Sequence, residues 1–256
     1  MSCKIPKKIH YCWFGRNPLP ESAIKCINSW KKFFPEYQII EWNEDNYDVY
    51  KIPYIKEAYE AKKYAFVSDY ARFDILYHEG GVYFDTDVEV IKSFDDILSQ
   101  GSFMGCEKDG VDENACILGT ETIAVAPGLG LATEAGTELY KEILHYYKTQ
   151  HFLNNDGSYN QETVVTKTTN LLLQYGLKNI KGVQHVCGIT IYPKDFFNPY
   201  SYDTHKLNIT ENSRSIHRYD ASWKSKGEKR KEAFLRILGK KNTSRLVRIK
   251  NILKGN

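Results

Sequence analysis

The part of this sequence that most constrains its fold runs from residue 54 to residue 90. Residues 54–79 are helix-prone and contain neither Gly nor Pro, so they predict one long helix. The pair Gly80 and Gly81 then ends that helix. The stretch VYFDTDVEV at 82–90 is rich in β-branched and aromatic residues and predicts a strand. A helix that leads directly into such a strand is typical of an α/β fold.

Two carboxylates stand one residue apart in this strand. Side chains at i and i+2 point to the same face, so Asp85 and Asp87 lie together. The alternation puts Val82, Phe84, Thr86 and Val88 on one face and Tyr83, Asp85, Asp87 and Glu89 on the other. Like charges this close repel each other, and a divalent cation between them removes the conflict. A DxD pattern can also be a plain solvated strand end, so the neighbouring sequence must decide between a metal site and a solvated end.

The surroundings place the pair at the edge of a parallel sheet. Residues 7–15 and 37–43 predict strands, and residues 20–35 between them predict a helix. This β-α-β order starts a parallel sheet, and ligands of open α/β sheets bind at the carboxyl ends of the strands. Further elements are expected as strands in 101–109 and 122–130, helices in 133–149 and 160–176, a strand leading into an aromatic loop in 189–200, and a strand end or loop in 214–223.

A polar cluster on the predicted long helix points toward the same edge. Ser68, Asp69 and Arg72 lie within one turn, and the aspartate and the arginine have the i, i+3 spacing at which side chains meet. The helix runs antiparallel to the strand that follows it. Its beginning and middle therefore approach the carboxyl end of that strand. The cluster is either an ion pair on the helix surface or a polar group of a site.

The composition indicates a folded protein without a membrane-spanning segment. The chain has 256 residues, 42% of them apolar, enough for one large domain with a sizeable core. The start, MSCKIPKKIHYCWFG, has no apolar run long enough for a signal peptide, and no stretch reaches the roughly 20 apolar residues of a membrane helix. Six scattered cysteines without a CxxC pair favour reduced thiols over a zinc site. We therefore expect a cytoplasmic protein.

The charge is divided unevenly along the chain. The net charge is +3, yet residues 224–256 hold twelve Lys or Arg and only two Glu, so the remainder is acidic. Apolar residues interleave with these charges, which predicts basic amphipathic helices. We expect a domain at 1–223 and a helical appendage at 224–256 that either lies on an anionic surface, at the inner face of the cell membrane, or packs on the domain. With little aromatic interleaving in the tail, nucleic acid is not an expected partner.

Three stretches together resemble glycosyltransferase family 32, whose members carry a DXD motif, and the catalytic domains of the large clostridial glucosylating toxins. They are IPKKIHYCWFG at 5–15, FVSDYARFDILYHEGGVYFDTDVEV at 66–90 and SIHRYDASW at 215–223. The first two match in order and spacing, and the third matches more loosely. The resemblance implies a GT-A (Rossmann-like) fold, a mixed sheet flanked by helices.

The resemblance also implies roles for single residues. Trp13 matches the tryptophan that stacks on the nucleotide base, and Tyr83 matches an aromatic residue beside the donor. Asp85 matches a carboxylate that reaches the donor ribose and sugar and shares in metal binding. Asp87 matches the direct ligand of the metal. Oxygen ligands that leave coordination positions open suit Mn²⁺ or Mg²⁺ bridging to a diphosphate.

Further roles follow at the helix and at the C-terminal end. Asp69 and Arg72, with Ser68 beside them, match the pair that contacts the sugar and phosphate side of the donor. The family closes its site where this chain has His217, an expected metal ligand, and the expected diphosphate contacts Ser222 and Trp223. The toxins carry an acidic residue near the position of His217, so the alternative there is a hydrogen-bonded loop histidine. No residue is marked as a covalent nucleophile, and the catalytic base stays unassigned.

The residues and the resemblance together predict a metal-dependent hexosyltransferase, and the resemblance implies that it is retaining. It moves a sugar from a nucleotide-diphosphate sugar to a glycan or lipid-linked glycan acceptor, in the synthesis of a bacterial capsular or surface polysaccharide. One alternative is a phosphatase of the haloacid dehalogenase type, whose DxD lies on the first strand and normally has Thr where this chain has Glu89. The other is a non-catalytic membrane-binding module carried by the tail. Only the transferase accounts for Trp13, Asp69, Arg72 and the DxD together.

Overall fold

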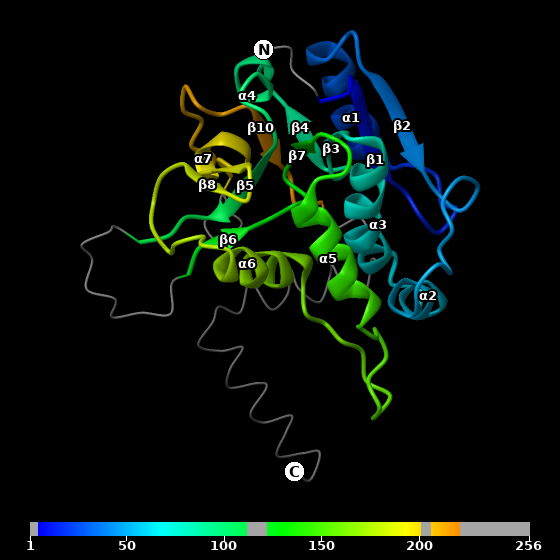
Figure 1. The fold of residues 1–256 in the computed structure, drawn as a ribbon. Coiled ribbons are helices and arrows are strands. Elements are labelled where there is room, and N and C mark those ends of the chain that lie inside the picture. The colour runs from blue at the N-terminus through cyan, green and yellow to red at the C-terminus, as the bar shows by residue number, and fades with distance from the viewer. Residues whose placement is uncertain (1–4, 112–121, 201–205, 221–256) are drawn as a thin grey trace, which may run out of the picture. The chain divides into compact units, whose positions relative to one another are not determined.

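A mixed sheet forms the centre of the molecule (Figure 1). The computed structural model describes residues 5–111, 122–200 and 206–220. Their strands are arranged in the order β2-β1-β3-β7-β5-β9-β8, with β6 paired to β5. The bounds of these strands are β1 Lys8–Cys12, β2 Gln38–Trp42, β3 Gly81–Tyr83, β5 Phe103–Lys108, β6 Ala124–Val125, β7 Leu131–Thr133, β8 Gln184–Val186 and β9 Ile189–Tyr192. The predicted α/β class is confirmed.

The first three strands are parallel, as the β-α-β order predicts. β1 pairs with β2 along its length, with Cys12 opposite Trp42 at the carboxyl end. On its other side β1 pairs with β3, with His10 opposite Tyr83. β7 then runs antiparallel to both β3 and β5, which makes the sheet mixed.

Helices cover both faces of the sheet, and each face has its own core (Figure 1). The helices are α1 Glu21–Phe33, α2 Pro53–Glu60, α3 Tyr64–Glu79, α4 Asp95–Leu98, α5 Glu138–Lys148, α6 Val164–Gln174 and α7 Lys194–Phe197. One core gathers buried residues of α2, α3, α5 and α6, among them Phe73 and Tyr140. The other gathers those of α1, α4 and α7, among them Trp30 and Phe197.

The segment 54–79, predicted as one helix, forms two, so that prediction is wrong. α2 ends before a residue, Lys62, whose φ of 57° lies in the left-handed region that closes helices. The Lys63 backbone N–H donates to the Ala58 carbonyl at 2.8 Å, which completes the closure. No Gly, Asn or Pro marks this break in the sequence. α3 alone carries the polar cluster.

The segment 82–90, predicted as one strand, is also divided, and that prediction is wrong too. A turn follows β3, in which the Val88 N–H donates to the Asp85 carbonyl at 3.0 Å. β4 (Val88–Val90) then joins a separate sheet, paired antiparallel with β10 (Ser215–His217). Burial of the side chains still alternates from residue 84 to residue 88, so the pattern is that of a strand although the backbone turns.

The predictions for the C-terminal segments and the cysteines have mixed outcomes. Residues 194–197 form the short helix α7 where an aromatic loop is predicted, whereas β10 confirms the strand end within 214–223. Cys12, Cys26, Cys106 and Cys187 are free, in agreement with reduced thiols. The predicted domain boundary at 223/224 and the basic tail lie outside the described residues and stay predictions.

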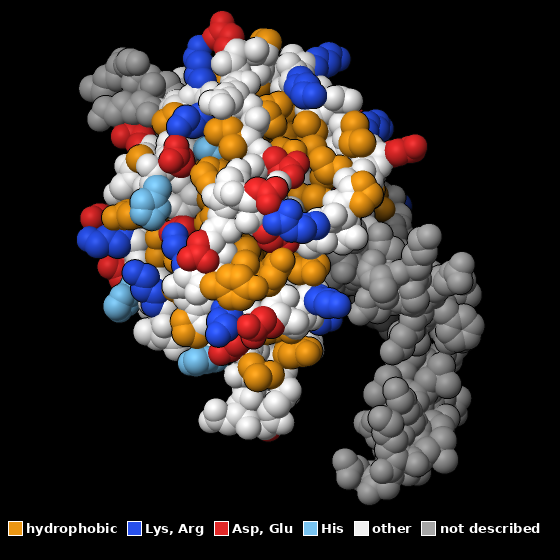
Figure 2. Space-filling view, turned by 90° about the vertical axis from the view of Figure 1, so that its right-hand side faces the viewer, with side chains coloured by type: hydrophobic (Ala, Val, Ile, Leu, Met, Phe, Trp, Pro, Cys, Tyr) orange, Lys and Arg blue, Asp and Glu red, His pale blue; other side chains and the backbone are white. Residues whose placement is uncertain are grey.

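The surface and the helix lengths complete the description. On the side where β2 and α2 lie, Figure 2 shows acidic, basic and apolar side chains intermixed, without a patch of one charge sign. In the described part of the chain, no helix combines the length and the apolar character needed to cross a membrane.

Candidate active site

The carboxyl ends of β1 and β3 bring Trp13 and Asp85 to one edge of the sheet. His10 lies opposite Tyr83 in parallel register, so the residues just beyond both strands leave the sheet on the same side. This is the edge at which open α/β sheets bind ligands. The Trp13 ring is half-buried there, and its indole N–H donates to the Asn17 carbonyl at 2.6 Å. The ring is thus oriented while part of its surface stays accessible.

A buried arginine on α3 links the helix to the DXD segment. The Arg72 side chain is 4% exposed, and its guanidinium lies 2.9 Å from Asp69 Oδ1 and 3.3 Å from Asp85 Oδ1. The guanidinium also lies over the Tyr83 ring, 5.1 Å from the centroid, and its Nε donates to the Ser68 carbonyl at 3.1 Å. The burial excludes the alternative of a helix-surface ion pair. One fixed cation holds two carboxylates, as the antiparallel run of helix and strand predicts.

The carboxyl group of Asp69 has an unusual protonation behaviour. Burial raises its pKa to about 6, although the Arg72 guanidinium acts in the opposite direction. Ser68, the preceding residue, is half-buried, and its hydroxyl donates to the Tyr64 carbonyl at 3.2 Å within the helix. The backbone carbonyl of Ser68, rather than its hydroxyl, contacts the cluster.

Asp85 is positioned by a glycine that the sequence analysis does not identify. The Asp85 backbone N–H donates to the Gly128 carbonyl at 3.1 Å, and the Tyr83 hydroxyl donates to Asp85 Oδ1 at 3.2 Å. A Cβ at Gly128 would stand 1.9 Å from Asp85 Oδ2 and 3.2 Å from an Arg72 nitrogen. Only a glycine leaves room for the carboxylate here. The stretch APGLG at 126–130 is the signal for such a close approach.

Asp87 is held by β10, the strand from the C-terminal part of the chain. Its Oδ1 lies 3.0 Å from His217 Nε2, and its Oδ2 accepts the Asp220 backbone N–H at 3.1 Å. Burial raises the pKa of Asp87, but the charge of His217 and these hydrogen bonds outweigh burial and lower it below the usual value. Burial likewise lowers the pKa of His217, and the charge of Asp87 reverses the effect and raises it. Between these two pKa values a carboxylate faces a protonated imidazole.

Asp87 and His217 fit a divalent cation better than Asp85 does. Adjacent donors of an octahedral ion at about 2.1 Å lie about 3 Å apart, and the Asp87 and His217 donor atoms lie 3.0 Å apart. The His217 Nδ1 is buried without a hydrogen-bond partner among the described residues. Within those residues no group of three or more His, Cys, Asp and Glu is arranged to hold a metal. The predicted ligand set of Asp85, Asp87 and His217 stays a prediction, and Ser222 and Trp223 lie outside the described residues.

Residues 20–104 match the family described as the glycosyltransferase sugar-binding region containing DXD motif. The chain carries a DXD-type glycosyltransferase sugar-binding region. The match includes α1, the Asp69–Arg72 pair and both aspartates of the DXD segment. It confirms the resemblance for the stretch at 66–90, whereas the stretches at 5–15 and 215–223 lie outside the matched residues.

Relatives of this glycosyltransferase region are known in yeasts. The chain is 30% identical over 159 residues to inositol phosphoceramide mannosyltransferase 1 of Schizosaccharomyces pombe, covering 58% of this chain and 44% of that protein. It is 28% identical over 104 residues to mannosyl phosphorylinositol ceramide synthase CSH1 of Saccharomyces cerevisiae, covering 39% of this chain and 27% of that protein. The chain thus spans less than half the length of these relatives.

Solved glycosyltransferase structures are similar at low sequence identity. The galactosyltransferase LgtC, in complex with donor and acceptor sugar analogs, is 12% identical over 84% of this chain and 88% of its own, with a TM-score of 0.42. The PaToxG glycosyltransferase is 19% identical over 66% of this chain and 69% of its own, also with a TM-score of 0.42. The fold description rests on the strand order given above, a mixed sheet flanked by helices as predicted for a GT-A protein.

Proposed function

We propose that this chain is a metal-dependent glycosyltransferase that takes a sugar from a nucleotide-diphosphate sugar. The observation that carries the proposal is the buried Arg72 bound to Asp69 and, at 3.3 Å, to Asp85, directly beside the Asp87–His217 pair. The family match over residues 20–104 supports the activity class. The phosphatase alternative requires the DxD on the first strand, whereas here it follows the third strand of the chain.

The residues divide the chemistry among them. A nucleoside diphosphate leaves readily only where its developing charge is stabilised, and a divalent ion at Asp87 and His217 supplies that stabilisation when bound. Arg72 is enclosed by carboxylates, so we assign it to holding Asp85 rather than to the diphosphate. We assign Asp69 and Asp85 to accepting hydrogen bonds from sugar or ribose hydroxyls. The partly accessible ring of Trp13 offers a surface for the base.

The donor and the acceptor belong to the same proposal. The names of both yeast relatives include a mannosyl group and a ceramide that carries inositol phosphate, so mannose is the first donor sugar to test. We propose two candidate acceptors: an inositol-containing lipid, and the bacterial capsular or surface glycan that the sequence predicts. Retention of the donor's anomeric configuration, which the family resemblance implies, is read from the anomeric proton of the product by NMR. Residues 224–256 would bring the chain to a lipid-linked acceptor at the inner face of the cell membrane.

Donor hydrolysis by the full chain tests the proposal. GDP-mannose, UDP-glucose and UDP-galactose are each incubated with Mn²⁺ or with EDTA, and release of the nucleoside diphosphate is followed. We expect turnover of at least one donor with Mn²⁺, and a loss of about 100-fold on Asp87→Ala. Asp48→Ala, at an exposed turn before α2, is the control and should keep full turnover. Turnover that survives both EDTA and Asp87→Ala would remove the metal from the proposal, and hydrolysis of simple phosphate esters instead would favour the phosphatase.

A further inference from the structure

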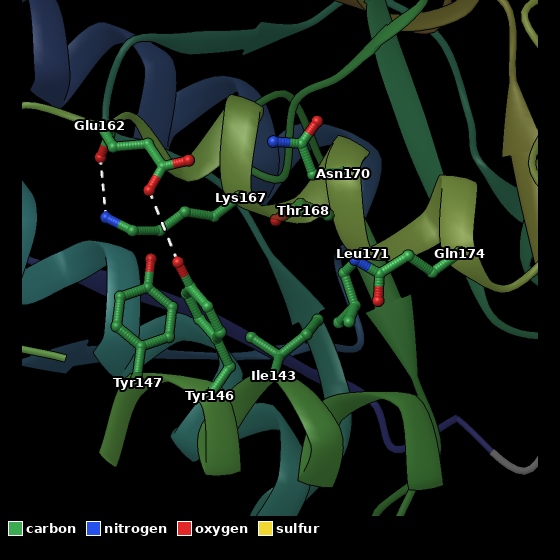
Figure 3. A pocket seen from close by; sticks show the side chains of 9 residues that line it. All are labelled: Ile143, Tyr146, Tyr147, Glu162, Lys167, Thr168, Asn170, Leu171 and Gln174. Carbon is green, nitrogen blue, oxygen red and sulfur yellow. Dashed lines mark hydrogen bonds between the residues drawn. The ribbon is translucent and has the colours of Figure 1, made fainter. Parts of the chain in front are cut away.

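A cavity of about 230 Å³ lies between α5 and α6 (Figure 3). Its polar lining is Tyr146 and Tyr147 from α5, Glu162 from the residues before α6, and Lys167, Thr168, Asn170 and Gln174 from α6. Ile143 and Leu171 complete the wall. At about 30 Å³ per water molecule, this volume corresponds to about eight water molecules. That space admits one hydroxylated six-membered ring but not two.

A buried lysine forms one wall of the cavity. Lys167 is 7% exposed, and its ammonium donates to the Glu162 backbone carbonyl at 2.8 Å and to the Tyr54 hydroxyl at 3.2 Å. It also lies over the rings of Tyr54 and Tyr147, at 4.9 and 5.5 Å from their centroids. Burial lowers the pKa of Lys167, with the charges of Glu162 and Asp69 acting against it. The ammonium is therefore held in place rather than mobile in solvent.

Two hydroxyl groups of the lining have no partner. Tyr147 is 1% exposed and Thr168 is 2% exposed, and neither hydroxyl oxygen has a hydrogen-bond partner among the described residues. A buried hydroxyl without a partner lowers stability, so such groups usually have a use. Tyr140, on the same helix as Tyr147, also has a buried unpartnered hydroxyl but does not line the cavity. Tyr140 therefore provides a matched control.

The cavity adjoins the polar cluster of α3. The Tyr147 ring packs edge-on against Tyr70, the residue after Asp69, with centroids 5.7 Å apart. It packs in the same way against Tyr54 at 5.1 Å. Asp69 and Lys167 are close enough for their charges to interact. A single layer of aromatic side chains therefore separates the cavity from the candidate donor site.

We propose that this cavity is a subsite that binds one pyranose or cyclitol ring of the acceptor; its assignment to the acceptor, though not the ring binding, rests on the proposed function. Sugar hydroxyls both donate and accept hydrogen bonds. The cavity supplies donors from Lys167, Tyr147 and the amides of Asn170 and Gln174, and acceptors from the Glu162 carboxylate and Thr168. The Tyr146 hydroxyl already donates to Glu162 Oε2 at 3.5 Å. A phosphate anion would be repelled by the Glu162 carboxylate. The aromatic rings suit the apolar face of a sugar ring.

Saturation-transfer NMR on the full chain tests ring binding without any nucleotide. The probes are methyl α-mannopyranoside, methyl α-glucopyranoside and myo-inositol, titrated against the wild type, Tyr147→Phe, Thr168→Val and Tyr140→Phe. The three substitutions remove or replace only hydroxyl groups that have no hydrogen-bond partner among the described residues, so all three variants should fold. We expect at least one ring to bind the wild type and Tyr140→Phe equally. Tyr147→Phe and Thr168→Val should each weaken that binding about fivefold to tenfold.

The outcomes separate this proposal from the donor reaction. Equal binding by all four proteins, or no binding of any of the three rings, overturns it. Displacement of the bound ring by millimolar inorganic phosphate also overturns it, because the cavity would then be an anion site. A chain that binds a ring with the expected pattern but hydrolyses no nucleotide sugar keeps the ring subsite and loses the proposed function. A chain that hydrolyses the donor but shows no ring binding keeps the proposed function and loses the ring subsite.

Discussion

The two aspartates of the DXD segment are held in opposite ways. Asp85 follows a strand of the main sheet and faces Arg72, a cation that keeps its charge at every working pH. Asp87 precedes a strand of the second sheet and faces His217, whose imidazole carries a positive charge only when it is protonated. Arg72 therefore neutralises Asp85 permanently. Beside Asp87, a metal ion can replace the positive charge that is lost when His217 releases its proton.

The difference lies also in how each partner is supplied. Arg72 comes from the helix just before β3, so the Asp85 half is formed by one continuous stretch of chain. His217 is 130 residues from Asp87 in the sequence. The Asp87 half therefore requires β10 to pair with β4. We infer that the motif combines two halves. The rigid half, Asp85 with Arg72, contacts the donor sugar, and the exchangeable half, Asp87 with His217, binds the cation.

The largest expected effect is on the rigid half. Arg72→Met leaves the buried carboxylate of Asp69 and the partly buried one of Asp85 without their cation, which should lower the free energy of unfolding by about 3–5 kcal/mol. Arg218→Met is the control, because Arg218 pairs with Glu89 at a side-chain exposure of 37% and should cost less than about 1 kcal/mol. Urea unfolding measures both. Similar losses in the two variants would mean that Arg72 is no more essential to the fold than a surface arginine.

The pH dependence of stability tests the raised pKa of Asp69, which contacts the arginine of the rigid half. Because burial raises the pKa of Asp69 from 3.8 to about 6, the folded state binds this proton more tightly than the unfolded state. The contribution of Asp69 to stability should therefore fall as the pH rises from about 4 to about 6, by roughly 3 kcal/mol. Asp69→Asn should abolish this fall, whereas Asp48→Asn at an exposed position should keep it. Parallel curves for the two variants from urea unfolding at pH 4, 5 and 6 would contradict the raised pKa.

The contrast between the halves also shows what the sequence can reveal. The i, i+3 spacing of Asp69 and Arg72 is a local signal, and the structure confirms that the two side chains meet. The glycine pair before the strand is a second local signal, and α3 ends there. The break at Lys62 has no such signal, since a lysine adopts the left-handed conformation only because the tertiary structure requires it. The division of 82–90 into two strands depends on pairing with a strand of distant sequence.

The same reasoning explains the residues that sequence analysis did not find. Gly128 matters through the carboxylate that packs against it, and Lys167 through the rings around it. Neither contact leaves a periodic pattern in the sequence. The role of His217 came from a resemblance rather than from spacing, and its 3.0 Å contact with Asp87 is visible only in three dimensions.

A smaller effect is expected where the rigid half meets the loop before β7. Gly128→Ala places a Cβ against Asp85 Oδ2, so the carboxylate must move. We expect a loss of about 1–3 kcal/mol in stability, as for overpacking elsewhere, together with weaker donor turnover. Gly136→Ala is the control: its φ of 77° makes it a strained site for alanine, but no atom lies within 4 Å. If both variants lose stability but keep full donor hydrolysis, the position of Asp85 does not matter for the reaction.

The smallest expected effect concerns the exchangeable half. His217→Gln keeps a side-chain hydrogen-bond donor near Asp87 but removes the imidazole, so Mn²⁺ binding should weaken about tenfold while stability changes little. Isothermal titration of Mn²⁺ into the full chain measures the affinity, with His185→Gln at an exposed position of β8 as the control. The Arg72→Met variant, where it folds, should bind Mn²⁺ like the wild type, because Arg72 lies on the other half. Unchanged affinity in His217→Gln, or a larger loss in Arg72→Met, would show that the cation depends on Asp85 and that the two halves are not separate.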